Sequence, residues 1–296
     1  MGDTLKNLNH LLKENHLDYK TVETTNGKIS YFETDNKNNK FETLLLLHGF
    51  GTNGLDYLPM IKLLKDRYHI ISLDLPERGE SKLISNNDFT PETIAKWLYS
   101  FINKIQIDNF HLVCHSIAAH YGLFYASKYS LETLILLDGG YLVPKYFHGY
   151  SLEKEINDTR SLIQSLSYNS EQELFESLIT QGNTYEKNII DRRLFKEEDG
   201  KLVFTLSEEV GVQMTLDVAN YPDYDLIRKI NKDIFLIRSD KPEEINDIRE
   251  KCINQFIKTK EISFTILKDS NHSLYHDKAS KVSILIDNWI KQNSHR

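Results

Sequence analysis

The sequence predicts an α/β protein with a mostly parallel central sheet, helices on both faces and a helical segment inserted between two strands. Two observations carry this prediction. Short, almost continuously apolar runs alternate with amphipathic helical patterns from residue 43 onward, as in sheets covered on both faces. Residues 141–224 interrupt this alternation with a charged, largely helical pattern.

The first part of the chain carries the patterns of a helix and a hairpin. Leucines recur at helical spacing over residues 5–14. Asn26-Gly27 is typical of a two-residue hairpin turn, so we expect strands over residues 19–24 and 28–34.

The alternating part predicts most of the sheet. Thr90 followed by Pro91 is a typical helix start. The expected strands are 43–47, 68–73, 109–114, 133–137, 234–238 and 262–267, and the expected helices are 91–105, 116–129 and 279–292.

The pattern of residues 141–224 predicts a helical cap. Its helical patterns cover residues 152–165, 171–180 and 208–218. We therefore expect a core of residues 1–140 and 225–296 with a cap of residues 141–224. Ligand sites favour such interfaces, so the cap is expected to shape a pocket.

Composition narrows the class of function. The 296 residues carry 36 Lys and Arg against 43 Asp and Glu, a net charge of −7. A mildly acidic chain is a poor candidate for binding nucleic acid or anionic membranes. Its two cysteines exclude a disulfide scaffold, and no apolar run approaches the ~20 residues that span a bilayer. We expect a cytoplasmic protein whose partner is a small-molecule substrate.

The strongest chemical signal surrounds Ser116. A predicted strand runs directly into this serine and a helix follows at once, the context of a nucleophile on a sharp turn. That turn usually reads G-x-S-x-G, whereas Cys114 and Ala118 stand at the two glycine positions here. The alternative is a serine that only caps the following helix.

A second signal is the loop His48-Gly49-Phe50-Gly51 after an apolar strand. The backbone N–H groups of Phe50 and Ile117 are candidate donors to a developing oxyanion. The same stretch also spells G-x-G-x-x-G from Gly49 to Gly54, and Asp74 lies near the ~20-residue offset of a ribose-binding acid. A dinucleotide-binding loop is therefore an alternative, although a hairpin precedes it.

His272 is the candidate general base, because it follows a late strand and gives the chain order Ser, Asp, His. The acid stays open. Asp240 follows the 234–238 strand, Asp138 follows the 133–137 strand, and Glu243 is a third candidate.

Two histidine pairs have the four-residue spacing of helical metal ligands: His111 with His115, and His272 with His276. The first pair spans a strand and a turn, and no glutamate follows either leading histidine. We expect no metal and no cofactor.

Taken together, four blocks resemble the α/β-hydrolase-fold superfamily, in particular small bacterial esterase- and lipase-type hydrolases with a helical cap. The blocks begin with HGFGTNG and continue as LVCHSIAAHYGLFYA, LILLDGGYL and DSNHSLYHDKASKVSILIDNWI. The resemblance covers about residues 28–138 and 230–292. It implies a nucleophile at Ser116, a base at His272, and oxyanion donors at Phe50 and Ile117.

The expected function is a serine hydrolase that cleaves a small ester, thioester, lactone or amide through an acyl-enzyme on Ser116. An alternative is a non-catalytic, ligand-binding protein of the same fold. A remote alternative is an NAD-dependent oxidoreductase that uses the Gly49–Gly54 loop.

Overall fold

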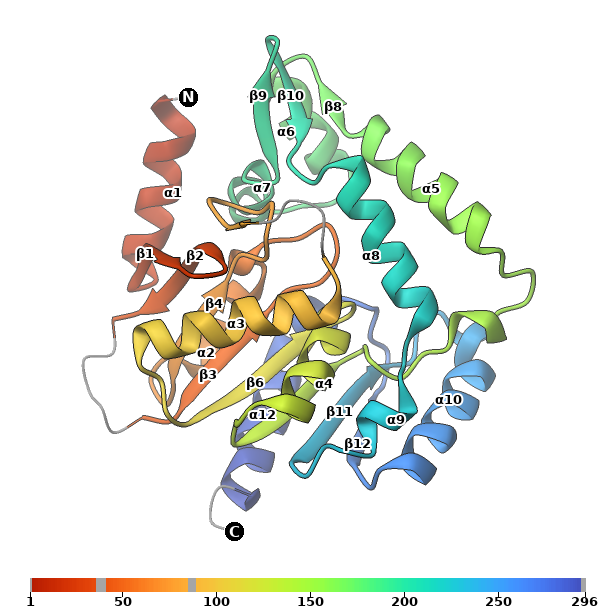
Figure 1. Cartoon of the computed structure of the whole chain (residues 1–296). Helices are drawn as coiled ribbons and strands as arrows, with labels where there is room; N and C mark the ends of the chain where they lie inside the picture. Colours follow the sequence, from red (N-terminus) through yellow and green to blue (C-terminus); the bar gives the residue numbers. More distant parts are fainter. Residues whose placement is uncertain (1, 36–40, 85–88, 294–296) are drawn as a thin grey trace.

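The computed structural model describes residues 2–35, 41–84 and 89–293. In these residues a nine-stranded sheet crosses the molecule, in the order β1-β2-β4-β3-β6-β7-β11-β12, with β5 paired to β2 (Figure 1). Pairing is parallel from β4 to β12 and antiparallel at the β1, β2 and β5 edge. The strands are β1 (Leu17–Thr24), β2 (Gly27–Thr34), β3 (Thr43–Leu47), β4 (His69–Leu73), β5 (Lys82–Leu83), β6 (Phe110–His115), β7 (Thr133–Leu137), β11 (Asp233–Ser239) and β12 (Ser263–Leu267).

Both faces of the central strands are buried, which explains their continuous apolar runs. In β3, Leu44 and Leu46 belong to one hydrophobic cluster, whereas Leu45 and Leu47 belong to the other. Successive side chains of a strand point to opposite faces. The leucine side chains of the run therefore pack alternately into the two hydrophobic clusters. The expected strand 43–47 is confirmed.

Helices α3, α4 and α10 pack on one face, and α2 and α12 pack on the other. The expected helix over 91–105 is confirmed, with Thr90 accepting a hydrogen bond from the Thr93 N–H and Pro91 in the first turn. The helices of the core are α1 (Gly2–Glu14), η1 (Gly54–Tyr57), α2 (Leu58–Leu64), α3 (Pro91–Ile105), α4 (Ala118–Lys128), η3 (Glu243–Ile245), α10 (Asn246–Thr259), α11 (Leu274–Asp277) and α12 (Ala279–Asn293).

The hairpin turn differs from its prediction by one residue. Thr24 pairs with Gly27, so the turn residues are Thr25 and Asn26, and Gly27 already belongs to β2. A Cβ on Gly27 would lie 2.0 Å from the carbonyl oxygen of Lys82. Glycine is needed here because β5 pairs with β2 at this point and its backbone leaves no room for a side chain.

The segment between β7 and β11 rises above the carboxyl ends of the parallel strands (Figure 1). It is mostly helical, as expected, but its described residues also form a small sheet, in the order β8-β10-β9. Asp199-Gly200, both at positive φ, forms the β9–β10 turn. The elements are η2 (Pro144–Tyr146), α5 (Leu152–Ser165), β8 (Ser167–Tyr168), α6 (Glu171–Thr180), α7 (Tyr185–Arg192), β9 (Phe195–Glu198), β10 (Lys201–Phe204), α8 (Glu208–Asn220) and α9 (Tyr224–Ile227).

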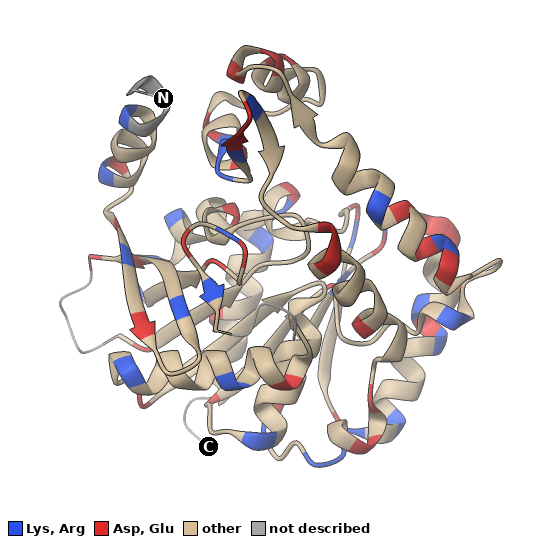
Figure 2. Ribbon diagram, turned by 45° about the horizontal axis from the view of Figure 1, so that its top comes forward, with Lys and Arg blue, Asp and Glu red and all other residues tan. Residues whose placement is uncertain are grey.

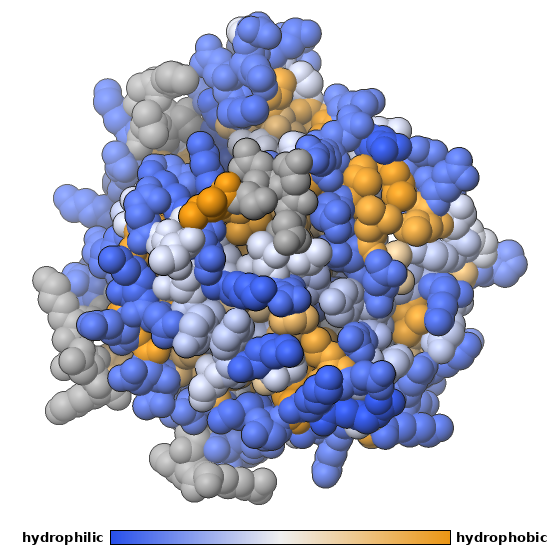
Figure 3. Space-filling model, in the orientation of Figure 1, coloured by the Kyte–Doolittle hydropathy of each residue, from blue (hydrophilic) through white to orange (hydrophobic). Residues whose placement is uncertain are grey.

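The surface is mixed in character. Figure 2 shows acidic and basic residues interspersed over the core and the segment above it. Figure 3 shows apolar residues exposed over α5 and α8, where Leu162 is 49% exposed. Within the described ranges, no helix combines the length and the hydropathy needed to cross a membrane.

Candidate active site

Ser116 occupies a strained turn between β6 and α4. Its φ is +56°, a left-handed conformation that side chains other than glycine rarely adopt. Its N–H donates to the Leu137 carbonyl at 3.0 Å, and its carbonyl accepts from the Ala119 N–H. The N-cap of α4 is Ile117, without a side-chain cap, so the Ser116 hydroxyl is not used as a helix cap.

Two glycines make room for this turn. A Cβ on Gly139 would lie 2.2 Å from the Ser116 carbonyl oxygen, and a Cβ on Gly122 would lie 2.6 Å from the Cys114 Sγ. Gly122 of α4 therefore leaves room for the Cys114 side chain, which takes the place of the usual glycine of the turn. Burial raises the pKa of the Cys114 thiol, which keeps this side chain neutral.

Ser116, His272 and Asp138 form one chain of hydrogen bonds. The Ser116 Oγ lies 2.9 Å from the His272 Nε2, and the His272 Nδ1 lies 2.9 Å from the Asp138 Oδ2. With Nδ1 donating to the carboxylate, Nε2 is free to accept the Ser116 hydroxyl proton. Ser116 is partly exposed and the side chain of His272 is 54% exposed, so a substrate can approach the pair.

Asp138 is buried and receives hydrogen bonds on both oxygens. Oδ1 accepts from the Ser239 N–H at 3.1 Å and from the Tyr141 hydroxyl at 3.2 Å. Oδ2 accepts from the Ser239 hydroxyl at 2.7 Å, in addition to His272. Burial alone would raise the pKa of Asp138, but the hydrogen bonds from His272 and Ser239 lower it below its ordinary value.

The structure distinguishes Asp138 from Asp240, the two candidate acids between which the sequence did not decide. The Asp240 Oδ1 accepts from the Ser270 N–H at 3.2 Å, and its Oδ2 lies 3.9 Å from the Lys268 Nζ. Side chains alternate along an extended chain, so Ser239 points to Asp138 while Asp240 points away. The structure thus brings Asp138, and not Asp240, to His272. Sequence reasoning missed Ser239, because a serine at a strand end carries no distinguishing pattern.

The Gly49–Phe50 turn passes directly beside Ser116. A Cβ on Gly49 would lie 3.0 Å from the Ser116 Cβ and 2.7 Å from the His115 Nδ1. Among the described residues, neither the Phe50 N–H nor the Ile117 N–H has a hydrogen-bond acceptor. The two candidate donors flank the nucleophile position and remain available to a ligand.

His115 holds the backbone of His272 by a hydrogen bond. Its Nε2–H donates to the His272 carbonyl at 3.0 Å, and its ring packs edge-on against Tyr275. Burial, reinforced by the neighbouring His272, lowers the pKa of His115 to about 3, so this imidazole is neutral. The Tyr275 hydroxyl donates in turn to the buried Asp56 at 2.6 Å. The neutral His115 imidazole, held by its packing against Tyr275, therefore fixes the His272 backbone.

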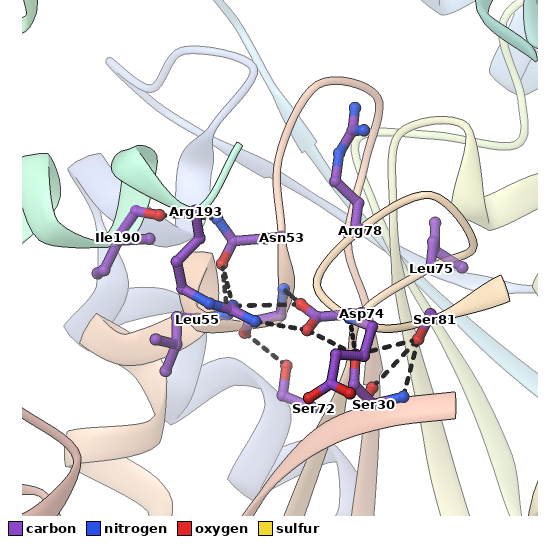
Figure 4. Close-up of polar contacts among 12 residues, drawn as sticks. Ser30, Asn53, Leu55, Ser72, Asp74, Leu75, Arg78, Ser81, Ile190 and Arg193 are labelled. Atoms are coloured by element: carbon purple, nitrogen blue, oxygen red, sulfur yellow. Dashed lines mark hydrogen bonds and ion pairs between the residues drawn. The ribbon is translucent and has the colours of Figure 1, made fainter. Parts of the chain in front are cut away.

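The ribose-binding role considered for Asp74 is wrong in this structure. Asp74 is fully buried, and its oxygens accept from the Gly54 N–H, the Ser30 hydroxyl and the Arg193 guanidinium (Figure 4). No oxygen is left for a ribose hydroxyl.

The histidine pairs also point to different partners. His111 Nδ1 lies 2.7 Å from the Thr133 hydroxyl, away from His115. In the described part of the chain, no three His, Cys, Asp or Glu side chains gather as a metal site.

Comparison with known proteins identifies the fold family. The profile of the alpha/beta hydrolase fold family matches residues 42–189, half of the chain. The chain is 32% identical over 122 residues to an uncharacterized hydrolase, YugF, of Bacillus subtilis, covering 40% of this chain and 44% of that protein. It is 30% identical over 161 residues to Lipase 1 of Psychrobacter immobilis, covering 52% and 50%. The chain thus spans about half the length, or less, of these curated relatives.

Solved structures extend the likeness to almost the whole chain. E-2-(acetamidomethylene)succinate hydrolase superposes with a TM-score of 0.75 at 16% identity, over 93% of this chain and 100% of that chain. The thioesterase domain from the curacin biosynthetic pathway superposes with a TM-score of 0.68 at 17% identity, over 92% and 99%. These similarities confirm the predicted fold, and the chain belongs to the α/β hydrolase fold family.

Proposed function

We propose that this protein is a serine hydrolase that cleaves a small ester, thioester, lactone or amide. The observation that carries the proposal is the hydrogen-bonded chain Ser116–His272–Asp138, with both links at 2.9 Å and Ser116 on a left-handed turn. The relatives named as lipases and the thioesterase domain of the same fold support an acyl-transfer reaction.

The first half of the reaction forms the acyl-enzyme. The Ser116 Oγ attacks the carbonyl carbon while its proton passes to the His272 Nε2. The N–H groups of Phe50 and Ile117 donate to the oxyanion of the tetrahedral intermediate. The carbon–heteroatom bond then breaks, and the His272 Nε2 returns the proton to the leaving group.

The second half releases the product. Water attacks the acyl carbon and gives a proton to the His272 Nε2, and a second tetrahedral intermediate forms at the same donors. Its collapse expels the Ser116 Oγ, which takes the proton back from His272. The carboxylate of Asp138 holds Nδ1–H throughout and stabilises the imidazolium.

Labelling with a fluorophosphonate probe, followed by peptide mapping, tests the nucleophile. We expect the label on Ser116, and its loss in His272→Ala. Ser116→Ala should lower kcat for p-nitrophenyl esters by about 10³-fold or more with an unchanged melting temperature.

Ser127→Ala is the matched control. Ser127 lies on α4, the helix that follows the Ser116 turn, and its hydroxyl donates to the Phe124 carbonyl at 2.8 Å. This variant should label and turn over like the wild type. An unlabelled but folded wild-type protein would refute the proposal and favour ligand binding without turnover.

A further inference from the structure

A buried polar cluster lies beside the Gly49–Gly54 loop, outside the Ser116 site. Its centre is Asp74, which follows β4 and is 0% exposed. The Asp74 Oδ1 accepts from the Gly54 N–H at 2.9 Å, and Oδ2 accepts from the Ser30 hydroxyl at 3.0 Å. A buried carboxylate is stabilised by a cation at hydrogen-bond distance, and the ion pair of Asp74 in this structure is with Arg193.

The cation comes from the inserted segment. Arg193 directly follows α7, and its guanidinium lies 2.7 Å from the Asp74 Oδ2 and 3.4 Å from Oδ1 (Figure 4). The guanidinium also stacks over the Phe32 ring at 4.5 Å. The Arg193 side chain is 11% exposed, so this is an internal contact and not a surface ion pair.

The same guanidinium reaches the loop. The Arg193 Nη1 donates to the Asn53 Oδ1 at 3.2 Å, and the Asn53 Nδ2 donates to the Ile190 carbonyl of α7 at 3.0 Å. Both ends of the Asn53 amide therefore contact the inserted segment, and its Oδ1 also caps η1 by accepting from the Leu55 N–H at 3.0 Å. A planar guanidinium can serve two acceptors in fixed directions, which an ammonium group cannot do.

A second arginine completes the attachment. The Arg78 Nε donates to the Thr52 carbonyl at 3.0 Å, and its Nη1 donates to the Thr205 hydroxyl of the inserted segment, also at 3.0 Å. The start of the loop is fixed by the core, because the Tyr57 hydroxyl donates to the Leu47 carbonyl. Phe50 lies between these anchors, so the direction of its N–H depends on where Thr52 and Asn53 are held.

We propose that Arg193 is a positioning residue of the inserted segment: through Asn53 it fixes the loop that presents the Phe50 N–H to the oxyanion, so that this donor is in place only while the segment is docked. The inference rests on the proposed function for its kinetic consequence. Its structural part, the tether between Arg193 and the loop, does not.

The chain offers a close control. Arg192 is the neighbouring residue on α7, it is similarly buried, and its Nε donates to Glu171 at 2.7 Å. Its contacts, Glu171 and the Phe195 carbonyl, lie within the inserted segment. Arg192→Met therefore removes a neighbouring ion pair, whose Glu171 carboxylate is 31% exposed, without touching the loop.

The experiment measures kcat and KM for p-nitrophenyl butyrate, the fluorophosphonate labelling rate, the melting temperature and amide hydrogen exchange of a peptide covering 48–54. In Arg193→Met we expect kcat to fall about 10- to 100-fold with KM within about threefold, because an oxyanion donor acts in the transition state. Loop exchange should accelerate. Arg192→Met should lower only the melting temperature.

The double variant Asp74→Asn/Arg193→Met separates folding from positioning. Without a buried unpaired charge its melting temperature should recover toward the wild type, while kcat stays low. Recovery of kcat together with stability would overturn the inference, as would loop exchange in Arg193→Met equal to that in Arg192→Met. If the wild type neither labels nor turns over, the proposed function fails, and the exchange comparison alone then decides whether the tether exists.

Discussion

Replacing Asp138 by asparagine tests which acid serves His272. Four donors converge on this carboxylate, and an asparagine can accept on only one of its two atoms. Near Oδ1, the Ser239 N–H is a backbone donor that cannot turn away. The amide oxygen must therefore stay on that side, and the amide nitrogen must face His272.

As a consequence, His272 adopts the opposite neutral tautomer. An amide nitrogen at 2.9 Å from Nδ1 makes Nδ1 an acceptor, so Nε2 carries the proton and cannot take one from Ser116. The Ser239 and Tyr141 hydroxyls can rotate to suit the new amide, so the fold should persist. We expect kcat to fall by about 10³- to 10⁴-fold, equivalent to about 4–5 kcal/mol in the barrier.

The assay compares Asp138→Asn with Asp240→Asn, using ester turnover and fluorophosphonate labelling at one pH, with thermal melts to show that both variants fold. Asp240 accepts from the Ser270 N–H, a contact that an amide oxygen preserves. Asp240→Asn should retain activity within about threefold. A folded Asp138→Asn with near wild-type kcat, or a larger loss in Asp240→Asn, would refute the reasoning.

Two further predictions concern stability and the turn. Burial lowers the pKa of His120 to about 4. The unfolded chain, with an ordinary histidine pKa of ~6.5, therefore binds this proton first as the pH falls. The free energy of unfolding should decrease between pH 6.5 and 4, by about 2 kcal/mol at pH 5. His120→Phe should flatten the decline of melting temperature between pH 6.5 and 4.5, and an unchanged slope would contradict this. Gly139→Ala should slow labelling of Ser116 and lower the free energy of unfolding by about 1–3 kcal/mol, because its methyl group would meet the Ser116 backbone. Gly149→Ala, with no atom within 4 Å but a φ of +70°, should cost only about 1 kcal/mol and leave labelling unchanged.

Local patterns determined most of the core. Apolar runs such as Thr43–Leu47 and the capped helix Pro91–Ile105 depend on neighbours in sequence, and the structure has them at the expected bounds. The turn around Ser116 was also predictable, because a strand, a small-residue turn and a helix follow one another directly. The β8-β10-β9 sheet was missed, since its strands are only two to four residues long and its helical neighbours dominate the pattern.

The sequence by itself determined the alternation of strands and helices and, to within a residue, where the central strands lie. It did not decide between Asp138 and Asp240, because both follow strands and only the alternation of side chains at the end of β11 sends Ser239 to Asp138 and Asp240 away. It also gave no sign that Asp74 meets Arg193, 119 residues later. Such pairings arise from the docking of distant segments, which no local spacing encodes.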